Sequence, residues 1–328
     1  MSRTWLWIAI IVIVAIAVVA MLGDLQHLDD RLAGFGWLAF VFALLLALGN
    51  YAIRFLRWQL YLRHQEVAVP VVSSLLVFGA GLSLSITPAK LGELIKSYLL
   101  REMHDVPAPR TAPIVVAERV TDLIALLALA VIGVAVYGVE TVLVIGSGSV
   151  IVAGLLLLAW PRPTRWLIEL MTRPARLRKF RAPLHETYEG LAILCRPKLL
   201  LIATAIAIPA WALECIGFAL IVNAFPGAHV ELGLAMMIYA ATTIAGALSF
   251  LPGGLGVTEG AMTVLLVRSA TGVDRPTAFD ATLLTRLATL WFAVLLGLVF
   301  LAMARARIAR RLNDKSTTNA PPGSRLQG

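Results

Sequence analysis

The chain has 328 residues, of which 59% are hydrophobic and only 14% charged, and its mean hydropathy is +0.86. Soluble domains have an apolar share of roughly 45–50%, so this composition excludes an ordinary soluble protein and indicates an integral membrane protein. The formal net charge of +9 does not predict nucleic-acid binding, because the Lys and Arg residues gather in short segments between apolar runs, as in cytoplasmic loops.

Six apolar runs are long enough to cross about 30 Å of hydrocarbon, which takes about 20 helical residues. They lie at about residues 5–22, 37–56, 114–137, 141–160, 199–222 and 281–303. The first run is longer than the apolar part of a secretory signal peptide, so we expect it to remain as a membrane anchor.

The positions of Lys and Arg predict the orientation, because cytoplasmic loops hold an excess of both. Residues 161–198 contain nine Lys and Arg against three Glu, and residues 305–315 are also basic. The loop around Asp24 and the turn at 223–231 contain almost no Lys or Arg. We therefore expect a multi-pass protein of the cytoplasmic (inner) membrane with both termini in the cytoplasm.

Two further apolar stretches, 71–100 and 233–270, are each interrupted by Pro and Gly. The flanking charges predict two re-entrant hairpins, the first entering and leaving at the cytoplasmic face and the second at the opposite face. The alternative is eight crossings, since the 16 residues of 71–86 would extend about 24 Å as a helix. Either way we expect an all-α integral membrane domain over 1–311 and a disordered tail over 312–328.

The two interruptions resemble each other in sequence. At an offset of 164 residues, five of nine aligned positions are identical: Leu84, Ser85, Pro88, Leu91 and Gly92 align with Leu248, Ser249, Pro252, Leu255 and Gly256. A glutamate and then an arginine on the next long apolar run follow each: Glu93 and Arg119, then Glu259 and Arg286. We interpret the pattern as an inverted repeat, about 37–160 and about 199–305, joined by the basic loop 161–198. Such repeats are typical of transporters, although Pro and Gly can also simply kink packed helices.

The interruptions also predict a binding chemistry. Proline donates no backbone hydrogen bond, and unpaired backbone groups cannot face lipid, so each break should face protein or a watery cavity. Helices that begin at about Leu91 and about Val257 would point N–H groups and the positive end of the helix dipole into that cavity. Such a helix start favours an anion.

An ionised side chain inside a membrane costs about 2.5–3.5 kcal/mol on insertion scales, so it is usually paired or functional. The candidates are Arg54, Arg57, Lys90, Glu93, Lys96, Glu118, Arg119, Asp122, Glu214, Glu259 and Arg286. The alternatives are that Lys90 and Lys96 extend to the headgroups, and that Arg119 pairs locally with Glu118 or Asp122. Arg286 has no acidic neighbour within one turn, and Glu214 is the one charge of its apolar run.

Motifs for several other chemistries are missing. The PGGLG segment at 252–256 lacks the Lys-Ser/Thr ending of a P-loop, the five histidines are scattered, and neither a Ser-His-Asp set nor HExxH occurs. Cys195 and Cys215 have no metal-ligand spacing. We therefore expect a protein that is not an enzyme and that has no cofactor and no metal site.

Four segments resemble a known family. RFLRW (54–58), TPAKLGELIKSYLL (87–100), AERVTDL (117–123) and SFLPGGLGVTEGA (249–261) are similar to the flippase-like membrane domain of the lysylphosphatidylglycerol synthase family. The resemblance covers about residues 5–305 and implies a stand-alone flippase-like protein without the soluble synthase domain. Carried over by motif, the implied site is Arg57, Pro88, Gly92, Glu93, Arg119, Pro252, Gly253, Gly254, Gly256, Glu259 and Arg286, and residue chemistry adds Lys90, Asp122 and Glu214.

The expected function is translocation of an anionic or zwitterionic lipid, such as a phospholipid or a polyprenyl-phosphate-linked lipid. The helix starts, Arg119 and Arg286 would bind the phosphate, and Glu93, Glu214 and Glu259 would meet a cationic or hydroxylated headgroup or carry a proton. The alternatives are a membrane enzyme of envelope lipid or glycan synthesis, and an accessory partner of such an enzyme. The expected partner is a membrane lipid, joined in the accessory case by envelope biosynthesis enzymes.

Overall fold

The computed structural model describes residues 32–137, 166, 169–170, 172–173 and 181–318 of the chain. Every regular element in this part is helical, apart from one isolated β-bridge, which confirms the predicted all-α membrane fold. The predicted crossings at 5–22 and 141–160 and part of the basic loop 161–198 lie outside the described residues. The elements, with 3₁₀ and π turns labelled η, are α3 (Trp37–His64), α4 (Val71–Leu82), η2 (Pro88–Leu94), α5 (Ile95–His104), α6 (Ala108–Tyr137), α9 (Arg181–Leu194), α10 (Pro197–Asn223), α11 (Leu232–Leu248), η4 (Pro252–Gly254), α12 (Val257–Ser269), α13 (Arg275–Arg286), η5 (Leu287–Trp291) and α14 (Phe292–Thr318).

Long apolar helices form where the sequence predicts membrane crossings. Within the described residues, Trp37–His64, Pro197–Asn223 and Arg275–Arg311 are long and apolar enough to cross a membrane, and α6 covers the predicted crossing at 114–137. α3 begins at the expected residue but continues beyond 56, because its last turns bury Trp58 and Tyr61. α14 continues to Thr318, so the first residues of the predicted tail are helical.

The chain divides into two compact units. Unit 1 consists of Met1–Arg54, Thr121–Ala153 and Thr204–Phe292, and unit 2 of Phe55–Val120, Gly154–Ala203 and Ala293–Gly328. α3, α6 and α10 are each divided between the two units.

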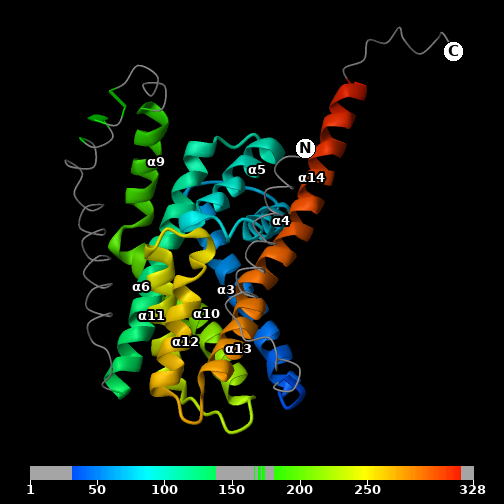
Figure 1. Ribbon diagram of the computed structural model, residues 1–328. Helices are drawn as coiled ribbons and strands as arrows, with labels where there is room; N and C mark the ends of the chain where they lie inside the picture. Colours follow the sequence, from blue (N-terminus) through cyan, green and yellow to red (C-terminus); the bar gives the residue numbers. More distant parts are fainter. Residues whose placement is uncertain (1–31, 138–165, 167–168, 171, 174–180, 319–328) are drawn as a thin grey trace, which may run out of the picture. The chain divides into compact units, whose positions relative to one another are not determined.

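Unit 1 contains the second interrupted helix. Its core consists of apolar side chains of α10, α11, α12 and α13 with parts of α3 and α6, and α12 packs between α11 and α13 (Figure 1). The loop before α11 pairs with the loop after α12: His229 N donates to the Thr271 carbonyl at 2.8 Å, and Thr271 N donates to the His229 carbonyl at 2.9 Å. The segment α11–η4–α12 is therefore a helical hairpin that begins and ends at one place.

Unit 2 contains the first interrupted helix. α4 and α5 pack against each other around η2, and the remaining helices are α9, α14 and the unit's parts of α3, α6 and α10. Glycines allow α14 to approach α4 closely: a Cβ on Gly297 would lie 2.1 Å from Ser83 N, and one on Gly79 would lie 2.4 Å from the Phe300 ring. Small residues at such contacts are common between membrane helices.

Three of the four helices that flank the interruptions are short, and the fourth, α11, has 17 residues. α4 has 12 residues, α5 has 10 and α12 has 13, which correspond to about 18, 15 and 20 Å at 1.5 Å per residue. A full crossing needs about 30 Å. These lengths fall below that of a complete membrane-spanning helix.

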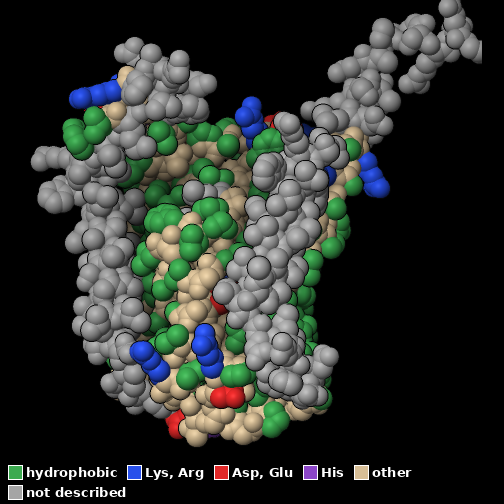
Figure 2. Space-filling model, in the orientation of Figure 1, with side chains coloured by type: hydrophobic (Ala, Val, Ile, Leu, Met, Phe, Trp, Pro, Cys, Tyr) green, Lys and Arg blue, Asp and Glu red, His purple; other side chains and the backbone are tan. Residues whose placement is uncertain are grey.

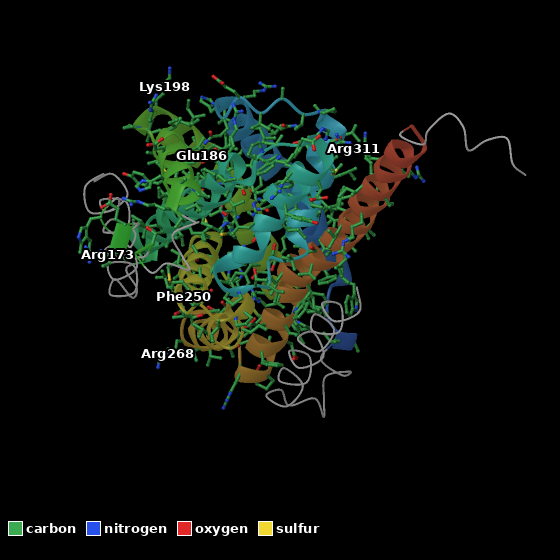
Figure 3. All side chains as sticks on the ribbon, turned by 90° about the horizontal axis from the view of Figure 1, so that it is seen from above. Arg173, Glu186, Lys198, Phe250, Arg268 and Arg311 are labelled. Carbon is green, nitrogen blue, oxygen red and sulfur yellow. The ribbon has the colours of Figure 1, made fainter. Side chains whose placement is uncertain are left out.

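The C-terminal helix is attached to the end of α5. Arg311 on α14 donates to the carbonyls of Glu102 and Met103 and pairs with Asp105 at 2.9 Å (Figure 3). Burial, assisted by the positive charges of Arg311 and Arg307, lowers the pKa of His104, which Asp105 raises in part. The neutral imidazole is therefore favoured beside this cluster of arginines.

Apolar side chains on the surface fit a lipid environment. Leu38, Val41, Leu45 and Leu48 are exposed on α3, and their spacing of three and four residues places them on one face of the helix. Figure 2 shows mainly apolar side chains over α11 and α12, with Lys and Arg only near the end where α12 and α13 are joined. An apolar belt of this kind on a helical protein is expected to face lipid tails.

Candidate functional site

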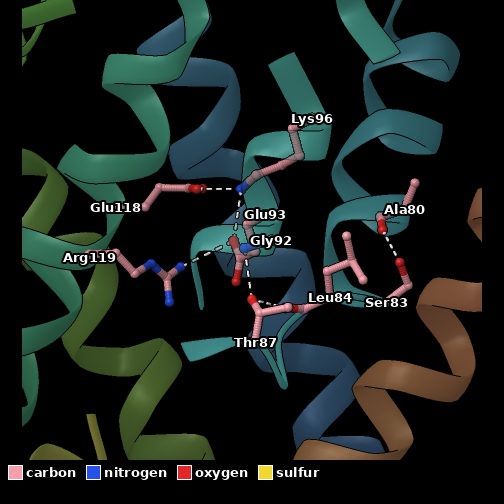
Figure 4. A network of polar contacts seen from close by, with 9 residues as sticks. All are labelled: Ala80, Ser83, Leu84, Thr87, Gly92, Glu93, Lys96, Glu118 and Arg119. Atoms are coloured by element: carbon pink, nitrogen blue, oxygen red, sulfur yellow. Dashed lines mark hydrogen bonds and ion pairs between the residues drawn. The ribbon is translucent and has the colours of Figure 1, made fainter. Parts of the chain in front are cut away.

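The first interruption forms a 3₁₀ turn in which the Gly92 amide already has a hydrogen-bond acceptor, Thr87. α5 begins at Ile95, about four residues later than expected, because Pro88–Leu94 forms η2. The Gly92 N–H donates to Thr87 Oγ1 at 2.7 Å, and that hydroxyl donates to the Leu84 carbonyl at 2.7 Å (Figure 4). The predicted helix start at about Leu91 with an available amide is thus corrected, because the Gly92 N–H is already hydrogen-bonded to Thr87. Lys90 lies in the same turn with a left-handed backbone, φ 55°.

Four charged residues form a cluster beside this turn. Lys96 Nζ donates to Glu93 Oε2 at 3.0 Å and to Glu118 Oε2 at 2.5 Å, and Arg119 Nη2 pairs with Glu93 Oε2 at 3.4 Å (Figure 4). The side chains of Lys96, Glu93 and Glu118 are at most 2% exposed. Buried charges in a low-dielectric environment need such partners of opposite sign.

Aromatic rings surround the lysine of this cluster. Lys96 Nζ lies 4.8 Å from the ring centroid of Trp58 and 5.6 Å from that of Phe78, which adds cation–π attraction. Gly81 makes room for the lysine stem, because a Cβ there would lie 2.7 Å from Lys96 Cγ. Lys96 therefore does not extend to the headgroups, an alternative that the sequence left open. Arg57, one residue before Trp58, is also fully buried.

The second interruption depends on glycine backbone conformations. Pro252–Gly254 forms the short turn η4, and Gly253, Gly254 and Gly256 have φ values of 60°, 68° and 84°. Residues with a side chain rarely adopt this region. α12 then begins at Val257, as predicted, with Gly256 as its N-cap.

Arg286 connects this break to the next long helix. Its Nε donates to Glu259 Oε1 at 2.7 Å, and its Nη2 donates to the Gly253 carbonyl. The other oxygen of the same carboxylate, Glu259 Oε2, accepts from the Gly256 N–H at 2.7 Å. One carboxylate thus bridges the guanidinium and the N-cap amide of α12, and the second contact is the capping box of this helix.

A π-helical turn, η5, follows Arg286 directly. The carbonyl of Thr289 in this turn accepts from Tyr51 Oη at 2.9 Å. π turns leave the regular hydrogen-bond pattern and occur often at functional sites, so the helix is irregular directly after Arg286.

Two further predicted acids are buried in unit 1. Glu214 accepts from Tyr239 Oη at 2.6 Å, and Asp122 accepts from Trp211 Nε1 at 3.1 Å. Both carboxylates are less than 10% exposed. Helix packing thus provides each carboxylate with an aromatic donor that sequence spacing does not indicate.

The structure thus arranges the predicted residues in separate sets. Glu93 and Arg119 join Lys96 and Glu118 in unit 2, whereas Gly253, Gly256, Glu259 and Arg286 form one set in unit 1. The sequence did not predict Thr87, Trp58, Tyr51 or Tyr239. A Thr next to Pro88 is a capping signal that could have been recognised, but no sequence pattern links Tyr239 to Glu214. Among the described residues, no three His, Cys, Asp or Glu side chains are placed to hold a metal ion.

Comparisons with known proteins agree with this architecture. A family model described as the lysylphosphatidylglycerol synthase TM region matches residues 6–297. The chain is also 25% identical over 332 residues to a UPF0104 membrane protein of Methanothermobacter thermautotrophicus, and the alignment covers 93% of this chain and 97% of that protein.

Proposed function

Because the chain belongs to the family of the lysylphosphatidylglycerol synthase TM region, we propose that it moves a lipid with an anionic or zwitterionic headgroup across the cytoplasmic (inner) membrane. Phospholipids and polyprenyl-phosphate-linked lipids share the phosphate that such a site would bind. The protein acts as a transporter and not as an enzyme in this proposal, with both termini in the cytoplasm.

The observation that carries the proposal is the arginine–glutamate pair beside each interruption. Arg119 pairs with Glu93, and Arg286 pairs with Glu259. In both cases the arginine lies on the long helix that follows the break, and the glutamate lies at the break itself or within one turn of it. A helix kink needs no such pair, whereas an anion-binding transporter needs positive charge at irregular backbone.

Among the contacts of the described residues named above, none specifically favours the alternative of a membrane enzyme. An acid–base mechanism would need a carboxyl or amine group available for proton transfer. Glu93 and Glu118 both bind Lys96, and these three side chains are buried among apolar neighbours. The contacts of Lys96 in this cluster resemble a structural ion network more than a reaction centre.

Replacing Arg286 by Gln tests the proposal. Purified protein in lipid vesicles should accelerate the exposure of fluorescent phospholipid to an external quencher, and Arg286→Gln should slow this movement at least about tenfold. A hydrogen bond to a charged group contributes about 1.5–3 kcal/mol. Because about 1.4 kcal/mol corresponds to a factor of ten, the loss of one such bond to the substrate accounts for this change.

Arg268→Gln is the matched control, because Arg268 is an exposed arginine near the end of α12 and should not affect movement. Equal rates for wild type, Arg286→Gln and empty vesicles would reject lipid movement as the function of this protein.

A further inference from the structure

Glu259 accepts hydrogen bonds from the two groups that the proposed function assigns to the substrate anion, the Arg286 guanidinium and the amide at the start of α12. Its Oε1 accepts from Arg286 Nε and its Oε2 accepts from the Gly256 N–H, each at 2.7 Å. A phosphate bound at the same place would need the same two donors. From this geometry we infer that Glu259 is an internal anion that closes the site at rest, and that an anionic headgroup binds by displacing it; the inference rests on the proposed function.

The pair can be reached by a ligand. The side chains of Arg286 and Glu259 are 12% and 16% exposed, and Gly256 lies at the surface. In unit 2 the corresponding arginine, Arg119, is 19% exposed, but its partner Glu93 is 2% and Lys96 1% exposed. A headgroup can therefore approach Arg286 directly, whereas it could reach Lys96 only if the surrounding side chains moved.

The surface next to Glu259 also has room for the exchange. Gly256, the N-cap of α12, and Gly260, in its first turns, are both exposed, and a Cβ built on either would meet no atom within 4 Å. This side-chain-free strip leaves space for an elongated ligand and for a carboxylate that rotates out of the pair.

Arg286 stays oriented when Glu259 leaves. Its Nη2 donates to the Gly253 carbonyl independently of the carboxylate, and Gly253 is held in its turn by the left-handed backbone of η4. The guanidinium would thus keep the direction in which it now meets Glu259. Preorganisation of this kind lowers the cost of binding the incoming phosphate.

The internal anion should weaken substrate binding in the wild-type protein. If Glu259 occupies the site about nine-tenths of the time, only about one-tenth of the protein is competent, and the apparent Kd is about tenfold higher than the intrinsic one. Removing the carboxylate charge should restore the intrinsic affinity, although it removes an ion pair from the folded protein.

The test measures binding of dihexanoyl-phosphatidylglycerol, a short-chain anionic lipid, to purified protein by the change in intrinsic tryptophan fluorescence. Glu259→Gln should bind about tenfold more tightly than wild type, and Arg286→Gln should not bind. Glu259→Asp, which is too short to bridge both donors, should also bind more tightly and replaces Glu259→Gln if that variant does not fold.

Glu231→Gln is the matched control, because Glu231 is an exposed glutamate directly before α11 and has no part in the site; it should not tighten binding. Unchanged or weaker binding by both Glu259 variants, or no detectable binding by either of them, would overturn the internal-anion role. This result is independent of the transport assay: binding without lipid movement contradicts the proposed function alone, and movement without tighter binding contradicts the internal anion alone.

Discussion

Gly254 illustrates how single residues set the shape of the second interruption. Its φ of 68° lies in the left-handed region, and a Cβ there would lie 2.7 Å from Thr258 Oγ1 and 2.9 Å from Gly246 Cα. α11 and α12 can approach each other here only because no side chain intervenes. The turn therefore needs glycine for both its backbone conformation and its packing.

Gly254→Ala should consequently destabilise the protein. The left-handed backbone alone costs about 1–2 kcal/mol for a residue with a Cβ, and the contacts with Thr258 and Gly246 add to it. Gly260→Ala is the control, since a Cβ there meets no atom within 4 Å and alanine in a helix is worth about 0.5–1 kcal/mol over glycine. The midpoint temperature of thermal unfolding in detergent should thus fall for Gly254→Ala and rise for Gly260→Ala. Equal midpoints for the two variants would contradict the role of Gly254.

At the residue scale, the sequence predicts the charged side chains but only part of their contacts. Glu259 could be selected because it follows a Pro/Gly break, and Arg286 because it stands on the next long apolar run with no acidic neighbour within one turn. Their pairing could not, since 27 residues separate them and helix packing alone brings them together. The same applies to Glu214 and Tyr239, which belong to different helices.

At the element scale, the two interruptions share a sequence pattern but differ in structure. After Pro252, three glycines with positive φ allow α12 to start at Val257. After Pro88, Ala89 and Lys90 replace two of those glycines, and the chain forms a longer 3₁₀ turn before α5 begins. The sequence alignment identified both breaks, but the start of α5 could not be predicted because it depends on the Thr87 cap and on the buried Lys96.

The Lys96 cluster should act as a structural core of the first hairpin. Lys96→Met would leave Glu93 and Glu118 buried with one cation fewer, and breaking a buried ion pair typically costs about 3–5 kcal/mol. We expect a correspondingly large loss of thermal stability, partly restored in Lys96→Met/Glu118→Gln, which removes one of the two carboxylate charges. A single variant as stable as wild type would show that this cluster does not hold η2, α5 and α6 together.

At the scale of the whole molecule, composition determines the fold class and charge predicts the orientation. The hydropathy of the sequence was sufficient to predict an all-α membrane protein, which the helical structure and the family match confirm. Hairpins and full crossings could not be distinguished from hydropathy, because both are apolar. α4, α5 and α12 would each extend about 20 Å or less, and the 17 residues of α11 about 26 Å, so re-entrant hairpins and full crossings both stay predictions.

The predicted orientation places Arg173 in the cytoplasm and Arg275 outside. Arg173 belongs to the basic segment 161–198, whereas Arg275 follows a loop that pairs with the 223–231 turn through His229 and Thr271. Both side chains are exposed, so Arg173→Cys and Arg275→Cys should be readily labelled, in a Cys195→Ser background that leaves only buried Cys215. A membrane-impermeant maleimide added to right-side-out membrane vesicles should label Arg275→Cys at once and Arg173→Cys only after permeabilisation. The predicted orientation rests on the positive-inside rule. Labelling of Arg173→Cys in sealed vesicles would therefore reverse it. The α11–η4–α12 hairpin, which contains Glu259, would then begin at the opposite membrane face.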